Sequence, residues 1–238
     1  MLKINHSFRT NIIDQTVLLH HSYRLRYNVY CIERRFLEAK AYPEAMETDL
    51  FDKYSIHFGA LDREGNLAGA VRLVRPSAIG LPMWDACEIF PNELEQLRKI
   101  SCAEVSRLAI SRTYRRRSED GLYGTDNTKD FENIARNNTD NERRQGPPLV
   151  LSLYIAVYQT AKRNGVTHLL AATEKSLQRL FRLYYFPFRP IGPEVDYFGP
   201  VTPYIMDLNE LDYELERHDP FLIADFLDGL EPEFCQRT

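Results

Sequence analysis

Residues 102–117 read Cys-Ala-Glu-Val-Ser-Arg-Leu-Ala-Ile-Ser-Arg-Thr-Tyr-Arg-Arg-Arg, and this stretch decides how the fold is interpreted. Its first half has the apolar and β-branched residues of a buried strand, yet it also carries Glu104, Ser106 and Arg107. Its second half is an arginine-rich loop, and the next strongly helical segment begins only at Pro148. Backbone N–H and guanidinium groups converge where such a loop leads into a helix, so the arrangement can bind an anion. Because an ionic strand is more often a structural ion pair, and an arginine run a solvated face, the functional interpretation depends on other segments.

Length and composition predict one globular domain. The 238 residues are enough to bury one large core or two small ones, and no linker divides them, so we expect a single domain over residues 1–238. Hydrophobic residues make up 44% of the chain, as in ordinary soluble proteins. The formal net charge of -4 argues against a general nucleic-acid binder, because neutralising phosphates needs a basic field. We therefore expect any anionic partner to bind at a local patch.

No feature of the sequence predicts a membrane span, a metal site or a tightly bound cofactor. No apolar run approaches the length that crosses a bilayer, and Met1–Thr10 lacks the apolar core of a secretory signal, so a cytoplasmic location is expected. The four cysteines have no Cys-x-x-Cys spacing and the six histidines have no ligand spacing. We therefore predict neither a disulfide framework nor a metal ion.

Hydrophobic periodicity predicts an alternation of helices and strands. The expected helices cover residues 14–37 (with a break near Cys31), 93–99, 149–164 and 174–185, and the expected strands cover 55–61, 67–74, the first half of 102–117, 167–173 and 201–208. The first two strands are joined by a short glycine-containing turn and form an antiparallel hairpin. Three stretches are expected to be irregular, namely 76–91, a polar insertion over about 118–147, and a loop with brief strand pieces over 187–200. The acidic tail, about 209–238, either packs across the domain or mediates self-association.

Ionisable groups occur in several unexpected places. Three carboxylates, Glu47, Asp49 and Asp52, fall within six residues just before the first hairpin strand. Their mutual repulsion is reduced if cations lie among them, although an exposed turn explains the same pattern. Arg72 occupies a core position of the second hairpin strand. The aromatic residues of the first helix, Tyr30 among them, either line a ligand pocket or simply pack.

The order of elements resembles the GNAT acyltransferase fold, an α/β (α+β) fold with a mixed central sheet flanked by helices. In that fold the loop after the central strand holds the pantetheine pyrophosphate. The usual glycine-rich loop is absent here, and an arginine-rich segment replaces it. The resemblance implies that this segment binds the phosphopantetheine phosphate and the acidic surface of an acyl carrier protein, with acyl-carrier protein or acyl-CoA as co-substrate. The arginines concerned are Arg112, Arg115, Arg116 and Arg117.

Four spaced motifs resemble those of the autoinducer (acyl-homoserine-lactone) synthases. They occur in the same order in this chain and span most of its first half. The motifs are Arg26-x-x-x-Tyr30, Glu47-x-Asp49-x-x-Asp52, Gly-x-x-Arg72-Leu and Glu104-x-Ser106-Arg107. Four ordered matches are much more specific than any one of them, since each is common by chance.

Other features resemble a related branch more closely. Phe36 replaces the Trp that the lactone synthases present to S-adenosylmethionine, and the polar insertion has no counterpart in their compact loop. With Tyr30-Cys31-x-Glu33 and Pro203-Tyr204, these features are similar to the N-acyl amino acid synthases and to the acyltransferases associated with PEP-CTERM/exosortase systems. This resemblance implies transfer of a fatty acyl group from acyl carrier protein to an amine, plausibly that of an amino acid.

The resemblance also implies roles for the residues of the motifs. Glu104, or Glu47 through a water, accepts the amine proton, and a backbone N–H near Ser106 polarises the thioester carbonyl. Arg72 and Arg107 hold the acidic motif. The residues expected to bind the small acceptor are Arg26, Tyr30, Phe36, Asp49 and Asp52. Two alternatives stay open: a lactone synthase that uses S-adenosylmethionine, and a domain that only binds an acyl ligand or a partner.

Overall fold

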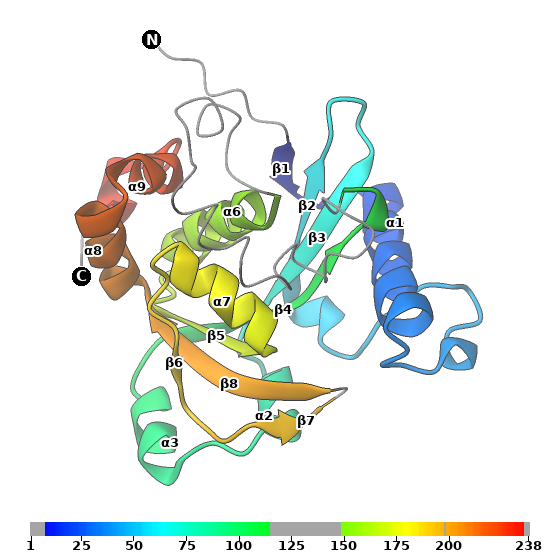
Figure 1. Ribbon diagram of the computed structural model, residues 1–238, viewed down its shortest axis with the longest axis horizontal. Helices are drawn as coiled ribbons and strands as arrows, with labels where there is room; N and C mark the ends of the chain where they lie inside the picture. Colours follow the sequence, from blue (N-terminus) through cyan, green and yellow to red (C-terminus); the bar gives the residue numbers. More distant parts are fainter. Residues whose placement is uncertain (1–7, 115–148, 198, 236–238) are drawn as a thin grey trace. The chain divides into compact units, whose positions relative to one another are not determined.

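The computed structural model describes residues 8–114, 149–197 and 199–235. It is a mixed α/β structure with an eight-stranded sheet in the order β1-β2-β3-β4-β5-β8-β6, and β7 pairs with β8 outside this path (Figure 1). The strands are β1 Arg9–Ile12, β2 Ser55–Leu61, β3 Leu67–Val74, β4 Cys102–Ile110, β5 His168–Thr173, β6 Arg189–Pro190, β7 Val195–Asp196 and β8 Pro200–Asp207. The helices are α1 Thr16–Tyr27, α2 Pro82–Ala86, α3 Pro91–Leu97, α6 Leu149–Arg163, α7 Lys175–Leu183, α8 Leu208–His218 and α9 Pro220–Leu227. A π-helix follows α1 over Asn28–Glu33, and single 3-10 turns cover Ala39–Ala41, Asp52–Tyr54, Arg112–Tyr114 and Pro232–Phe234.

The chain divides into two compact units, each built from separate segments. The first comprises Met1–Asp49, His57–Arg72 and Arg107–Ala156, and the second comprises Leu50–Ile56, Leu73–Ser106 and Val157–Thr238. Four elements, β2, β3, β4 and α6, contribute residues to both. The division therefore cuts across secondary structure, and the prediction of one domain stays a prediction.

In the first unit, α1 and the π-helix pack on the sheet. Leu25 and Val29 form a buried cluster with Ala70 of β3 and Ala109 of β4. The small alanine side chains allow the helix to approach the strands closely. Gly69 precedes Ala70 in β3 and faces the other side of the sheet, where an added Cβ would be 2.8 Å from Ile110 Cδ1. In Figure 1 the helix lies beside the sheet strands that it covers.

The second unit has its own apolar core. Nine buried residues form it, with Phe51, Trp84, Cys87, Ile100 and Ala172 packed against them: Val74, Leu81, Met83, Ile89, Leu97, Cys102, Leu170, Ile191 and Ile205. β5 pairs with β8 in antiparallel register along all six of its residues, from His168↔Asp207 to Thr173↔Thr202. Its parallel pairing with β4 covers only three pairs and ends at Glu104↔Leu170. The parallel strands β4 and β5 therefore separate after Leu170, whereas β5 stays paired with β8 as far as Thr173.

Most of the expected elements are confirmed, and two expectations need correction. The first helix becomes a π-helix at Asn28 and ends at Glu33 instead of Leu37. The stretch 76–91 is not wholly irregular, since Leu81-Pro82 begins a short helix, α2. The four-residue strand β1 was not expected, because four residues are too few for a hydrophobic period to be recognised.

No secondary structure was predicted for the acidic tail. It forms α8 and α9, which are capped by Asp207 accepting from Asn209 N–H and by Asp219 accepting from Leu222 N–H. The expected insertion at 118–147 lies outside the described residues. None of the helices in the described part of the chain has the length and apolar character needed to cross a bilayer.

Candidate functional site

Glu47 is the centre of a buried ionic group in the first unit. It is 0% exposed, and its Oε2 accepts from Arg26 Nε at 2.5 Å. Its Oε1 accepts from Arg107 Nε at 3.1 Å. Arg26 comes from α1 and is 2% exposed, so a carboxylate without these guanidinium groups would be costly at this position.

Asp49 continues the same group toward solvent. Arg72 NH1 and NH2 donate to its two carboxylate oxygens at 2.6 and 2.8 Å, which is the strong bidentate arrangement. Arg107 NH2 lies 3.1 Å from Asp49 Oδ2, so Arg107 bridges both acids. Asp49 is 23% and Arg107 16% exposed, whereas Arg72 is 1% exposed. We call the five residues Arg26, Glu47, Asp49, Arg72 and Arg107 the acid–arginine cluster. Its accessible edge is Asp49 and Arg107.

The backbone of β4 is distorted at Arg107. Its φ angle is 56°, in the left-handed region that a non-glycine residue rarely adopts inside a strand. Tyr30 lies beside it: the phenol donates to Leu108 C=O at 2.7 Å, and its ring is 5.7 Å from the Arg107 guanidinium carbon. Burial raises the pKa of Tyr30 to about 12, so the phenol stays a donor at neutral pH. Backbone strain held by side chains in this way is common at functional sites.

Two further residues near the cluster have shifted pKa values. Burial, and then the charge of Glu47, raise the pKa of both Cys31 and Tyr42, while Arg107 lowers both. Cys31 belongs to the π-helix, and Tyr42 contacts Tyr27 edge-on. Cys31 belongs to the motif Tyr30-Cys31-x-Glu33, whereas no sequence motif indicated Tyr42 as a site residue.

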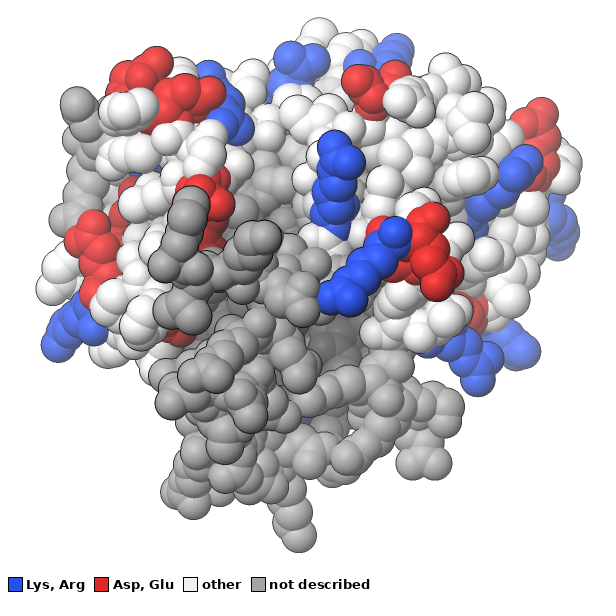
Figure 2. All heavy atoms as spheres, turned by 90° about the horizontal axis from the view of Figure 1, so that it is seen from above, with Lys and Arg blue, Asp and Glu red and all other residues white. Residues whose placement is uncertain are grey.

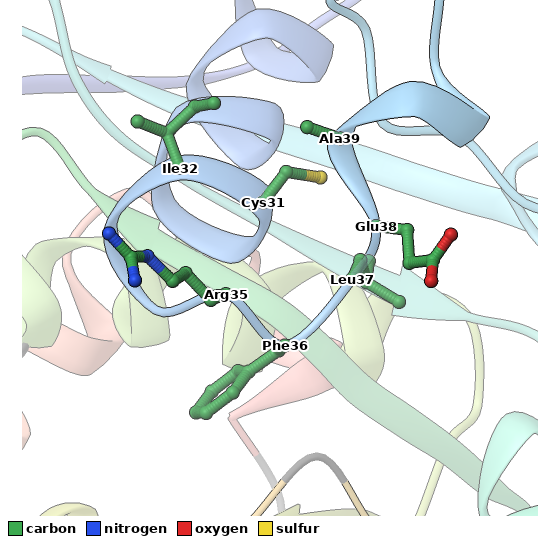
Figure 3. Close-up of a pocket in the computed structure, with 7 residues that line it drawn as sticks. All are labelled: Cys31, Ile32, Arg35, Phe36, Leu37, Glu38 and Ala39. Atoms are coloured by element: carbon green, nitrogen blue, oxygen red, sulfur yellow. The ribbon is translucent and has the colours of Figure 1, made fainter.

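A pocket opens beside Cys31. It has a volume of about 500 Å³ and is open to solvent. Figure 3 shows the Cys31 sulfur directed toward Ala39, with the Phe36 ring directed away from it. Arg34 lies 5.5 Å from the Phe36 ring centroid, in cation–π contact. The residues that line the pocket are Cys31, Ile32, Arg35, Phe36, Leu37, Glu38 and Ala39.

Glu104 belongs to the second unit and has a different environment. It is 3% exposed, and its Oε2 accepts from the backbone N–H of Met83 at 2.8 Å. Met83 lies in the first turn of α2, so Glu104 satisfies one of the unpaired donors of that helix. This bond favours the ionised carboxylate. The charge of Glu104 contributes, after burial, to raising the pKa of Cys87 to about 11.

The structure thus brings six of the predicted residues together in the first unit, namely the acid–arginine cluster and Tyr30. Phe36 lies in the neighbouring pocket, and Arg112 is an exposed residue of the 3-10 turn after β4. Asp52 and Ser106, like Glu104, belong to the second unit. Arg115, Arg116 and Arg117 lie outside the described residues. No group of three or more His, Cys, Asp or Glu side chains suited to a metal ion occurs within residues 8–114, 149–197 and 199–235.

The face drawn in Figure 2 carries both basic and acidic side chains. There the basic and acidic side chains of the described residues are interspersed. The cluster, by contrast, concentrates three guanidinium groups around two carboxylates in a mostly buried place.

Comparisons with known proteins concern the fold of the chain. The family model described as an acetyltransferase (GNAT) domain matches residues 25–123, a segment that contains the whole acid–arginine cluster. No curated protein gives a significant match to the sequence. Among solved structures, the chain is similar to FeeM, an N-acyl amino acid synthase from uncultured soil microbes, with 18% identity, a TM-score of 0.57, and coverage of 87% of this chain and 94% of that one.

Two further solved structures are similar over most of their length. TofI, solved in a ternary complex with an inhibitor and MTA, has 18% identity and a TM-score of 0.60, with coverage of 95% of this chain and 100% of that one. BjaI, a CoA-dependent acyl-homoserine lactone synthase solved with SAM and isopentyl-CoA, has 20% identity and a TM-score of 0.54, with coverage of 89% and 88%. The chain therefore has the GNAT-like fold that an N-acyl amino acid synthase and acyl-homoserine lactone synthases also have.

Proposed function

We propose that this protein is an N-acyltransferase that moves a fatty acyl group from a thioester to the amine of an amino acid or a similar small acceptor. The observation that carries the proposal is the acid–arginine cluster, in which buried carboxylates and guanidinium groups hold Asp49 and Arg107 at an accessible edge. A zwitterionic acceptor matches such an edge, because the carboxylate can bind its ammonium group and the guanidinium its carboxylate.

The buried and the accessible members of the acid–arginine cluster are assigned different roles. Glu47 has both oxygens engaged by Arg26 and Arg107 and is fully buried, which favours a positioning role over a role as base. Arg72 positions Asp49 through the bidentate pair. Asp49 and Arg107 then contact the acceptor, and the pocket that Phe36 lines receives its side chain. The acceptor site proposed here consists of residues of the first unit alone.

Acyl transfer also needs a base, a donor for the oxyanion and an anchor for the thioester. The bound ammonium group first gives a proton to a base, and the resulting amine nitrogen then attacks the thioester carbonyl carbon. The C–S bond breaks, and the proton that the attacking nitrogen loses goes to the leaving thiolate. We assign the proton to Glu104, whose ionised form the Met83 N–H favours, and the oxyanion to a backbone N–H in the Ser106–Leu108 segment. Arg112, Arg115, Arg116 and Arg117 are proposed to bind the phosphopantetheine phosphate of acyl carrier protein. We also propose that acyl carrier protein is the acyl donor and that the protein is cytoplasmic. The proposal includes a link between this protein and PEP-CTERM/exosortase systems.

Thiol release and product mass test the proposal. Purified protein is incubated with acyl carrier protein thioester or acyl-CoA and a panel of amino acids, and free thiol and N-acyl product are quantified. We expect amine-dependent thiol release, and we expect Asp49→Asn to raise the KM for the acceptor. Asp14→Asn is the control, because Asp14 is an exposed carboxylate of the first unit outside the cluster. A protein that never consumes acyl thioester would instead be the non-catalytic binding domain.

A lactone synthase is the second candidate. The fold likeness to BjaI, whose structure was solved with SAM and isopentyl-CoA, favours it. The same reaction mixture with S-adenosylmethionine as the only amine separates the two, because an acyl-homoserine lactone and an N-acyl amino acid differ in mass. Lactone formation at a rate above that of every amino acid tested would replace our assignment of the acceptor.

A further inference from the structure

The hairpin turn between β2 and β3 is tied to the 3-10 turn that follows β4. The Tyr114 hydroxyl donates to Asp62 Oδ2, although 52 positions separate the two residues in sequence. Just before the 3-10 turn, Ser111 N–H donates to Ala68 C=O of β3 at 2.9 Å. All four residues belong to the first unit. The hairpin therefore holds the start of the arginine-rich segment at two points, one on the backbone and one on a side chain.

The Asp62 carboxylate is fixed by its own loop. Its Oδ1 accepts from the backbone N–H groups of Glu64 and Asn66 at 2.9 and 2.8 Å, and its Oδ2 accepts from Asn66 Nδ2 at 3.0 Å. The bond from Tyr114, and then the bond from the Asn66 side chain, lower the pKa of Asp62 to about 2, so this carboxylate is ionised at neutral pH. Tyr114 thus binds a charged acceptor whose orientation the loop has already set.

The Tyr114 ring and backbone have further contacts. The Phe8 ring lies edge-on to the Tyr114 ring, with 5.9 Å between the ring centroids and 76° between the ring planes. Tyr114 N–H donates to Ser111 C=O at 3.0 Å, which closes the turn Arg112–Tyr114. Arg112 is the first residue of this turn, and it is exposed. Because Arg112 and Tyr114 share a single turn, the contacts of Tyr114 fix the backbone that carries the Arg112 guanidinium.

We propose that Asp62 and Tyr114 are positioning residues for the acyl donor, and that they act through Arg112 on the phosphate of the phosphopantetheine arm. This inference rests on the proposed function, in which Arg112 binds that phosphate. An arginine side chain loses conformational freedom when it binds an anion, and a backbone that is already ordered reduces this cost. Breaking the Asp62–Tyr114 bond should therefore weaken the binding of donors that carry the phosphate. The acceptor site, whose acids and arginines are held by their own ion pairs, should be unaffected.

Two small donors that differ only in the phosphate test this inference. Acyl-phosphopantetheine and acyl-pantetheine of one chain length are compared as substrates of wild type and of Tyr114→Phe, which keeps the ring beside Phe8 and removes the hydroxyl. We expect the KM for acyl-phosphopantetheine to rise about fivefold in the variant. The KM for acyl-pantetheine, the KM for the amino acid and kcat should stay at their wild-type values. A purely structural role of the bond would change the KM for both donors alike.

A double variant shows whether the effect passes through Arg112. In an Arg112→Ala background, Tyr114→Phe should cause no further rise in KM. Asp62→Ala removes the acceptor of the same bond, so it should reproduce the effect of Tyr114→Phe, and it replaces that variant if Tyr114→Phe folds poorly. Tyr213→Phe is the matched control and should leave every constant unchanged, because Tyr213 is a half-exposed tyrosine of α8 in the second unit.

The outcomes keep the inference distinct from the proposed function. An equal rise in KM for the two donors, an unchanged KM for both, or a further rise in the Arg112→Ala background overturns the inference, while acyl transfer itself stands. The same holds for a wild type that uses acyl-phosphopantetheine no better than acyl-pantetheine, inactivity with both included. Absence of transfer by the wild type from these donors, from acyl carrier protein and from acyl-CoA overturns the proposed function and the inference together.

Discussion

Glu47 shows how much a single carboxylate can hold in place. It accepts from Arg26 and Arg107, which reach it from α1 and β4. We predict that Glu47→Gln lowers the free energy of unfolding by about 3 kcal/mol, because removing one member of a buried ion pair leaves the other charge poorly compensated. Urea unfolding measures this change.

The matched control is the same substitution at an exposed pair. Glu38 and Lys40 lie 3.4 Å apart, with 73% and 83% of their side chains exposed. Glu38→Gln should change the free energy of unfolding by less than about 0.5 kcal/mol. Equal effects of the two substitutions would show that the cluster does not stabilise the fold in the way its geometry implies.

Tyr30 supports the distorted part of β4 through its hydroxyl. Tyr30→Phe keeps the ring over Arg107 but removes the bond to the Leu108 carbonyl. We expect a loss of about 1 kcal/mol in the free energy of unfolding, and a fall in kcat if the strand geometry serves the reaction. Tyr27→Phe, in the same helix, is the comparison. Wild-type stability and turnover in the Tyr30 variant would assign no role to the hydroxyl.

A substitution at Glu104 separates the structural role of this residue from its proposed role as the base. Glu104→Gln retains an oxygen that can accept from Met83 N–H, so the end of α2 should stay capped and the unfolding temperature nearly unchanged. Loss of the carboxylate should nevertheless lower kcat about a hundredfold if Glu104 is the base. Stopped-flow thiol release measures kcat. Full turnover in this variant would move the base to another residue.

Elements whose apolar pattern is long and regular could be predicted from the sequence. The hairpin strands 55–61 and 67–74 agree with β2 and β3 residue for residue, and the Asp62–Asn66 turn fixes the two strand ends that it joins. The π-helix after Tyr27 could not be predicted in kind, since it depends on how the helix packs. The strand β1 has only four residues, too few for a period to be recognised.

The hairpin turn leads to a prediction about pH. Tyr114, which donates to Asp62, and Asn66 together lower the pKa of Asp62 from 3.8 to about 2. A depressed pKa means that this contribution to stability is present above pH 3.8 and is lost as the pH falls from there to about 2. Asp62→Asn should therefore have a flatter dependence of unfolding free energy on pH in this window than wild type. Asp14→Asn should keep the wild-type slope, and a parallel change in both variants would contradict the assignment.

At the scale of the whole molecule, the sequence motifs named charged residues that the structure brings together in one cluster. The motifs of the first half named Arg26, Glu47, Asp49 and Arg107 before their contacts were known, because charged groups in apolar patterns need partners. Arg72 and Arg107, which were expected to hold the acidic motif, contact Asp49 and Glu47. The pairing of Arg26 with Glu47 could not be assigned, since the two residues lie 21 positions apart in sequence and their contact depends on tertiary packing.

The two compact units raise the question whether the chain unfolds as one domain. Four elements run through both units, so unfolding one unit would break the hydrogen-bonded ladders of strands and a helix that the other also uses. We therefore predict a single cooperative transition. Trp84, the only tryptophan, lies in the second unit and reports on it, whereas far-UV circular dichroism reports on both. The two signals should give the same midpoint and slope in urea. A tryptophan transition that is separated from the circular dichroism transition would mean that the units are independent domains, because shared strands could then no longer couple their stabilities.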